Sequence, residues 1–265
     1  MALVSRLESN VIMLTLRNPH SILAAILARP GDIENIQLPA DGGDAWAKVA
    51  QAARAARIKI SSGGGPRESL RNSQRDRRSE VDRDGGRLSS GEARVQESEG
   101  VPLEALFSDA RERSGGKGLW LALDSLQDPQ NIGAIFRAAA FFGVEGILLT
   151  QERSAPLSST VYDIACGGLE SVPFTLQVNL QRAFEKAKAE GLWILGTSEH
   201  AKESLFEVKR DRPWLLVLGN EEKGIRRLTE ESCDVLCSVP PRSKTVTSLN
   251  VSVAAGIAIS HLGRG

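Results

Sequence analysis

The feature that most constrains this chain is a series of short, almost wholly apolar segments in its second half, each followed by a stretch of helical character. These segments lie at 119–123, 146–149, 192–196, 214–218 and 235–239. Strands that are apolar throughout are buried on both faces, as in a parallel sheet that helices cover on each side. We therefore predict an α/β domain over residues 118–265, with ligands bound beyond the carboxyl ends of its strands.

The first half of the chain divides by composition into two parts. Residues 1–61 show helical spacing at 19–28 and 45–56 and a short strand candidate at 33–38, which predicts a small α/β domain. Residues 62–117 are rich in Arg, Gly and Ser and poor in large apolar side chains, so we predict a flexible linker there. An arginine-bearing arm that contacts RNA phosphates is the alternative for this stretch.

Charge and cysteine content argue against several functional classes. The chain has 33 basic and 33 acidic residues, and a net charge of zero does not fit a protein that coats nucleic acid by bulk attraction. Cys233 and Cys237 fit buried thiols better than metal ligands, because no other Cys or His lies at ligand spacing. We expect no metal and, without a run of about 18 apolar residues, no membrane span. The absence of a disulfide framework and of a secretory core favours the cytoplasm, while Arg6 and Arg17 leave the mitochondrial matrix as the alternative.

A polar loop follows the first apolar strand. Asp128-Pro129 predicts a turn, and Asn131 can cap a helix over 132–142. Arg137 is then a charged residue in an otherwise apolar helix, which fits a surface ion pair as well as a functional site. Asn131 and Arg137 do not share a helical face, so they converge only if Asn131 lies in the loop.

Two further apolar strands lead into polar loops. After 214–218, Gly219 leaves room for a flat ligand on the backbone, and Glu221 supplies a carboxylate. After 235–239, Ser248 or Asn250 stands at the start of an apolar helix, where free N–H groups favour an anion. Ordinary turns and N-caps explain each loop equally well, so the spacing alone predicts a polar pocket lined by three loops. No Walker A loop or dinucleotide-binding glycine motif follows any strand, which argues against nucleotide hydrolysis and NAD binding.

The three loops together resemble the signature motifs of the SpoU/TrmH family in the SPOUT superfamily of RNA methyltransferases. The match runs in order through 128–137, 218–221 and 248–252, and the stretches 153–157 and 165–173 also look like the family. The resemblance covers residues 118–262. One such motif is weakly specific, but three in order at the ends of the right strands are highly specific.

This resemblance implies a deep trefoil knot, S-adenosylmethionine held by the knot loops, and a homodimer formed through the last helix, with the active site completed across subunits. The catalytic positions that it implies are Asn131, Arg137, Glu221, Ser248 and Asn250. The cofactor-binding positions that it implies are Thr197, Leu218, Gly219, Val239 and Leu249. A guanidinium is too basic to be an easy general base, so a phosphate-clamp role for Arg137 is as consistent with the family as a role in activating the hydroxyl.

The implied activity is methyl transfer to the 2′-OH of a ribose in RNA. Residues 18–26 resemble the L30e-type substrate-binding domain of the branch that modifies a guanosine in 23S-type large-subunit ribosomal RNA, which favours rRNA over tRNA. The alternatives are a tRNA ribose 2′-O-methyltransferase of the same family and a catalytically inactive knot protein that binds RNA or aids ribosome assembly. The chain departs from the family at Lys244, where a glycine usually precedes the Ser248 motif.

Overall fold

The computed structural model describes residues 11–62 and 91–263. Within 91–263 it contains a seven-stranded sheet, and every neighbouring pair of strands in it is parallel. In spatial order the strands are β7 (Phe174–Gln177), β6 (Gly146–Thr150), β5 (Leu119–Leu123), β10 (Trp214–Leu218), β8 (Trp193–Thr197), β11 (Val235–Ser238) and β9 (Glu203–Ser204). The predicted parallel α/β domain is confirmed, while the trefoil knot stays a prediction of the resemblance.

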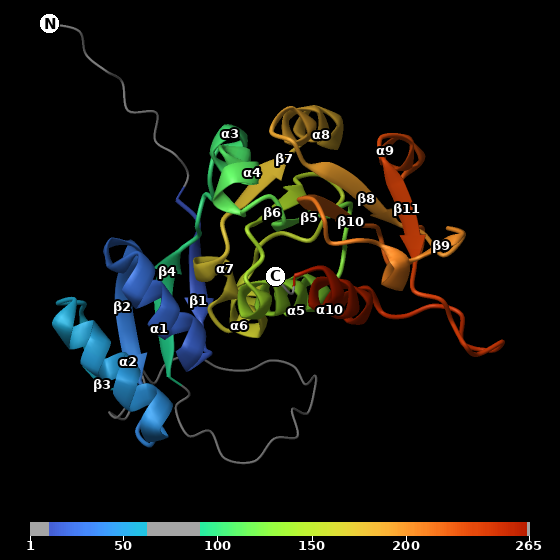
Figure 1. The fold of residues 1–265 in the computed structure, drawn as a ribbon. Coiled ribbons are helices and arrows are strands. Elements are labelled where there is room, and N and C mark those ends of the chain that lie inside the picture. Colours follow the sequence, from blue (N-terminus) through green and yellow to red (C-terminus); the bar gives the residue numbers. More distant parts are fainter. Residues whose placement is uncertain (1–10, 63–90, 264–265) are drawn as a thin grey trace, which may run out of the picture.

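Helices cover both faces of this sheet (Figure 1). One face carries α5 (Pro129–Phe142), α6 (Ser159–Ala165), α7 (Gly168–Ser171) and α10 (Val251–Leu262). The other face carries α3 (Leu103–Phe107), α4 (Ala110–Arg113), α8 (Leu180–Ala189) and α9 (Arg227–Glu231).

Strand β5 shows why its sequence is apolar at every position. Leu119, Leu121 and Leu123 pack into the core on the α5 and α10 face, while Trp120 and Ala122 pack into the core on the α3 and α8 face. All five are buried, so a polar residue at any position would lie in one of the two cores. This arrangement leaves polar side chains for the loops at the strand ends, which is where the candidate site lies.

The N-terminal unit contains a four-stranded sheet among the described residues, in the order β1-β4-β2-β3. Its strands are β1 (Met13–Leu16), β4 (Glu92–Gln96), β2 (Ile33–Leu38) and β3 (Ile60–Ser62). Two helices accompany it, α1 (Pro19–Ala28) and α2 (Gly43–Ala55). The predicted elements at 19–28 and 33–38 agree with α1 and β2 residue for residue. The L30e-type character of this unit stays a prediction.

The prediction of a linker over 62–117 is wrong for residues 91–117. Strand β4 pairs antiparallel with both β1 and β2, and its alternate residues Ala93 and Val95 are fully buried. Helix α3 then adds Leu106 and Phe107, and α4 adds Ala110, to the core of the larger sheet. The apolar–polar alternation of β4 is short and lies among charged residues, so it is not recognised as a strand from the sequence. Residues 63–90 of the predicted linker, with its arginine-bearing arm, lie outside the described residues.

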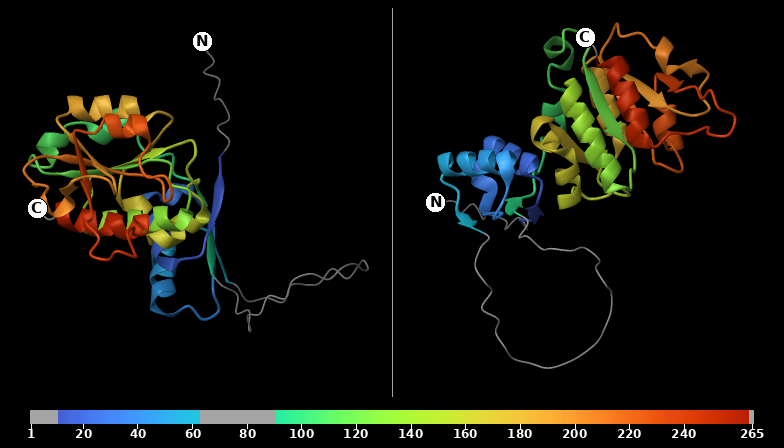
Figure 2. Two further views of the ribbon diagram at one scale, coloured as in Figure 1. Left: turned by 90° about the vertical axis from the view of Figure 1, so that its right-hand side faces the viewer. Right: turned by 90° about the horizontal axis from the view of Figure 1, so that it is seen from below.

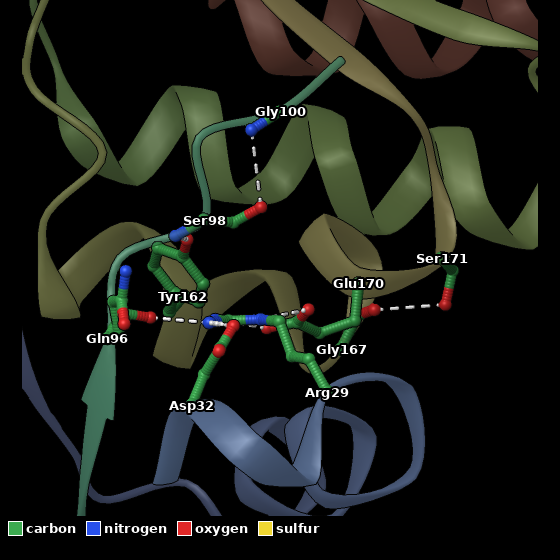
Figure 3. Close-up of polar contacts among 9 residues, drawn as sticks. All are labelled: Arg29, Asp32, Gln96, Ser98, Gly100, Tyr162, Gly167, Glu170 and Ser171. Carbon is green, nitrogen blue, oxygen red and sulfur yellow. Dashed lines mark hydrogen bonds and ion pairs between the residues drawn. The ribbon is translucent and has the colours of Figure 1, made fainter. Parts of the chain in front are cut away.

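The N-terminal unit packs against α6 and α7 at one end of the larger domain (Figure 2). Asp163 on α6 accepts hydrogen bonds from the backbone N–H groups of Arg17 (3.0 Å) and Asn18 (2.9 Å). Arg29, directly after α1, forms a bidentate ion pair with Glu170 on α7, with nitrogen–oxygen distances of 2.8 and 2.9 Å (Figure 3). The core is continuous across this junction.

No helix in the two described ranges combines the length and the apolar composition that a membrane crossing needs.

Candidate active site at the carboxyl ends of the strands

One residue from each of the three motifs meets in a hydrogen-bonded cluster. The side-chain amide of Asn131 donates from Nδ2 to Glu221 Oε1 (3.1 Å), and Asn250 Nδ2 donates to Asn131 Oδ1 (2.9 Å). Asn131 is 5% exposed, so both polar ends of its amide are satisfied inside the protein. The cluster therefore joins the loops that follow β5 and β10 to the start of α10.

The expectation that Asn131 caps its helix is wrong. Asp128 is the N-cap and accepts a hydrogen bond from Gln130 N–H (2.8 Å), while Pro129 occupies the first turn, where a missing N–H costs nothing. Asn131 is the third residue of α5, and its amide is consequently free to reach Glu221 and Asn250. The dipeptide Asp128-Pro129 begins the helix instead of forming a separate turn before it.

This helix start places Arg137 away from the cluster in the same chain. Six positions on a helix of 3.6 residues per turn separate the two side chains by about 120° around the axis and by about 9 Å along it. Arg137 is exposed, and among the described residues its guanidinium forms no hydrogen bond or ion pair. The structure therefore brings together Asn131, Glu221 and Asn250 and does not bring Arg137 to them.

The loop that carries Glu221 is held by its own backbone and by the neighbouring loop. The N–H groups of Asn220 and Gly224 bond to each other's carbonyls (3.0 and 2.9 Å). Asn220 Nδ2 donates to the carbonyl of Ser125 (2.9 Å). A Cβ on Gly219 would lie 2.2 Å from the backbone of Gly224 and Ile225. Gly219 thus permits the loop to close on itself, and its Cβ position is filled by protein backbone instead of being open to a flat ligand.

Glu221 is held as a carboxylate by its hydrogen-bond donors. Partial burial by itself raises the pKa of Glu221, but donors from the Asn131 amide and from the backbone N–H groups of Gln127 and Asp128 outweigh burial and lower the pKa. At neutral pH the cluster therefore contains a negative charge that faces Asn131.

We expect Glu221→Gln to lower the free energy of unfolding at neutral pH and to have a smaller effect at about pH 3. Because the pKa of Glu221 is lower in the folded state, its stabilising contribution is present above the pKa of the unfolded carboxyl. It is lost as the pH falls through the folded value. Urea unfolding of both proteins at the two pH values measures the difference. Glu222→Gln serves as the control, and an equal loss of stability at both pH values would contradict the assigned ionisation.

A cavity of about 400 Å³ lies at the carboxyl ends of β8 and β11. Among the predicted cofactor-binding positions, Thr197, Val239 and Leu249 line it, as does the predicted catalytic residue Ser248. Leu218 and Gly219 are buried and do not line it. Since Leu249 precedes Asn250 in the chain, the cavity and the Asn131–Glu221–Asn250 cluster adjoin at the start of α10.

The loop before α10 accommodates the residue that departs from the family. Lys244 does not adopt a positive φ, so the backbone needs no glycine there, and its side chain does not line the cavity. Asn250, and not Ser248, is the N-cap of α10, since its side-chain oxygen accepts hydrogen bonds from the N–H groups of Ser252 and Val253.

Several residues of this region are not predicted from the sequence. Ser198, Glu199 and Arg242 line the cavity, and Asp124 at the end of β5 is fully buried and paired with Arg226 (2.7 Å). The signal for Asp124 and Ser198 was their position directly after an apolar strand, at the edge where parallel sheets bind ligands.

Cys166, Cys233 and Cys237 are free thiols. Burial, with smaller contributions from nearby carboxylates, raises the pKa of both Cys233 and Cys237 to about 12. Across the described part of the chain, no three side chains of His, Cys, Asp or Glu cluster as metal ligands would.

The fold resembles that of solved methyltransferases. The SpoU methyltransferase AviRb from Streptomyces viridochromogenes superposes with a TM-score of 0.72 at 20% identity, covering 95% of this chain and 89% of that one. The AdoMet-bound rRNA methyltransferase from Sinorhizobium meliloti superposes with a TM-score of 0.69 at 19% identity, covering 95% and 87%. The architecture is thus that of the SpoU class of methyltransferases.

Sequence comparison identifies the family. The sequence model of the SpoU rRNA Methylase family matches residues 118–260, which is more than half of the chain, so this protein belongs to that family. It is 42% identical over 161 residues to the 23S rRNA (guanosine-2′-O-)-methyltransferase RlmB of Pseudomonas aeruginosa, covering 61% of this chain and 64% of that protein. The RlmB protein of Nitrosomonas europaea is 43% identical over 155 residues, covering 58% and 59%. The matches thus span less than two thirds of these two relatives.

Proposed function

We propose that this protein transfers a methyl group from S-adenosylmethionine to the 2′-OH of a guanosine ribose in 23S-type large-subunit rRNA. The observation that carries the proposal is the meeting of Asn131, Glu221 and Asn250, one from each family motif, beside a cavity of ligand size. Membership of the SpoU rRNA methylase family supports the reaction class, and the names of the RlmB relatives support the rRNA substrate.

The cavity suits a nucleoside-like cofactor with a charged tail. Its volume of about 400 Å³ lies in the range of small-molecule pockets, which is roughly 300–1,000 Å³. Leu205, Val239, Leu249 and Ala258 would hold the adenine, and the hydroxyls of Thr197 and Ser248, with the charges of Glu199 and Arg242, would hold the polar parts. When bound, S-adenosylmethionine supplies an activated methyl group on a sulfonium.

The protein's own side chains would then orient the ribose and hold the phosphate beside it. Glu221 fixes the Asn131 amide, and Asn131 fixes Asn250, so the three present a rigid polar surface to the substrate. Such preorganisation reduces the entropy lost on positioning the hydroxyl. In the proposed mechanism Arg137 clamps the neighbouring phosphate or lowers the cost of removing the hydroxyl proton.

A homodimer through α10 is part of this proposal. Val253 on α10 is 50% exposed, an unusual exposure for a large apolar side chain on a packed helix. A partner subunit that packs on α10 would bury this side chain. It would also allow the Arg137 of one chain to act with the Asn131 cluster of the other, which a single chain does not allow. We place the protein in the cytoplasm, in keeping with bacterial rRNA methyltransferase relatives.

We expect Ala254→Leu to weaken S-adenosylmethionine binding by about tenfold or more. Ala254 is half-buried on the second turn of α10 and lines the cavity, so a larger side chain would fill ligand space without entering the packed core. Equilibrium dialysis with labelled cofactor measures the affinity. Ala189→Leu, on the exposed end of α8, is the matched control, and unchanged binding in Ala254→Leu would remove this cavity from the cofactor site.

Methyl transfer from labelled S-adenosylmethionine to unmodified large-subunit rRNA and, separately, to bulk tRNA tests the proposal. Label at one 2′-O position of the rRNA is the expected result. Label in tRNA alone would show that the substrate is tRNA and not rRNA. Absence of both transfer and cofactor binding would favour the inactive RNA-binding protein.

A further inference from the structure

A groove runs between the N-terminal unit and the larger domain. Its volume is about 410 Å³, and it is lined by His20 on α1, by Arg137 and Phe141 on α5, and by residues 165–168. The N-terminal unit contributes His20 to one wall, and the larger domain, including the predicted catalytic arginine, contributes the rest of the lining.

The chemistry of this groove suits a nucleic-acid strand. Arg137 and Phe141 lie four positions apart on α5, so both side chains project from one face of the helix. His20 and Arg137 supply N–H donors, Phe141 is 82% exposed, and of the residues that the structure describes no acidic side chain lines the groove. Nitrogen donors, a guanidinium among them, beside an exposed aromatic ring are the combination with which proteins bind phosphates and stacked bases of unpaired RNA.

Gly167 and Gly168 bring the two walls together. A Cβ on Gly167 would lie 2.8 Å from Cβ of Ala24 on α1, and a Cβ on Gly168 would lie 3.0 Å from the backbone N of Arg137. The two glycines thus touch the N-terminal unit on one side and the arginine-bearing turn of α5 on the other. Any movement of α7 would change the distance between the walls.

The Arg29–Glu170 ion pair holds this junction in place. Glu170 lies two residues after Gly168, and its side chain is 6% exposed, while that of Arg29 is 15% exposed. Arg29 also bonds to Asp32 and to the carbonyl of Gln96, so the guanidinium ties α7 to α1 and to the end of β4 (Figure 3). Because this ion pair is largely buried and the Arg29 guanidinium donates to three partners, it restricts the relative movement of the two units.

We propose that the groove binds the RNA strand beside the target ribose, and that Arg29 and Glu170 are positioning residues that keep its two walls at a fixed separation. This inference rests on the proposed function and assigns to it a binding surface shared by both units. RNA held by His20 would then lie in reach of the Arg137 of the same chain.

The test uses the full chain and an unmodified large-subunit rRNA transcript. We measure the Kd for the transcript without cofactor, and kcat and KM for methyl transfer, in His20→Ala, Glu170→Gln and the double variant. Each single variant is expected to raise Kd and KM by about tenfold with kcat at saturating RNA and cofactor affinity within about twofold of the parent. The double variant is expected to bind the transcript no more weakly than Glu170→Gln does, because His20 contributes to RNA binding only while the two walls are aligned.

Glu34→Gln is the matched control, since it removes the acid of an exposed ion pair with Arg94 in the same unit, and it should change none of these values. Unchanged RNA binding in His20→Ala, or strictly additive losses in the double variant, would overturn the inference. If His20→Ala also self-associates more weakly in sedimentation while its RNA binding is unchanged, the groove is a contact between two copies, and the inference is likewise overturned. If the parent transfers no methyl group, the proposed function fails, while the Kd series still tests the groove.

Discussion

Replacing Arg137 by alanine is expected to reduce methyl transfer to rRNA by about a hundred- to a thousandfold. The guanidinium is exposed and without a partner in the described part of the chain, so its removal leaves no buried charge and creates no cavity. Alanine favours helix formation, and α5 already has three alanines directly after Arg137, so the fold should be retained. The loss should therefore appear in kcat, or in kcat and RNA affinity together, and not in cofactor affinity.

Single-turnover methyl transfer and equilibrium dialysis of labelled cofactor separate these effects. Arg182→Ala is the matched control, because Arg182 is an exposed helical arginine on the opposite face of the sheet, 78% exposed and 3.7 Å from Glu104. Full turnover by Arg137→Ala would remove Arg137 from the mechanism. A parallel loss of cofactor binding would show that Arg137 stabilises the structure of the site instead of acting in the methyl transfer.

Replacing Gly219 by alanine is expected to destabilise the protein by about 3 kcal/mol and to abolish most methyl transfer. The added Cβ would lie 2.2 Å from the backbone of Gly224 and Ile225, and backbone cannot move aside as the end of a side chain can. Relieving the clash would open the loop that carries Glu221. The hydrogen bond from Asn131 to Glu221 would then be lost as well.

Urea unfolding and methyl transfer measure the two consequences. Gly31→Ala is the control, because a Cβ there meets nothing within 4 Å. A Gly219→Ala protein with parental stability and parental activity would show that the loop has another closed arrangement. Parental stability with lost activity would instead indicate that the backbone at this position contacts a ligand, as the sequence alone suggested.

Much of the architecture could be predicted because it depends on local periodicity. The apolar run at 119–123 requires a strand covered on both sides, and β5 is such a strand. The spacing at 19–28, closed by Pro30, is sufficient to define α1. Strand β4 escaped prediction because its two partners, β1 and β2, lie more than fifty residues earlier in the chain, and five residues among charged neighbours give little local signal.

Some short sequence patterns are compatible with two local structures, and tertiary packing decides between them. Asp128-Pro129 is compatible with a free turn and with the start of a helix. The structure begins α5 there, and this choice decides that Asn131 points to Glu221 and that Arg137 points elsewhere. The prediction that Asn131 caps the helix failed for this reason.

The sequence by itself determined the order of the elements, the parallel sheet and the three polar loops, since each follows from the apolar pattern of a few neighbouring residues. Only the tertiary structure decided which side chains meet. Asn131 bonds to residues 90 and 119 positions away, and Arg29 pairs with a residue 141 positions away. Such contacts depend on how complete helices and strands pack against one another, and periodicity within a short window carries no information about that packing.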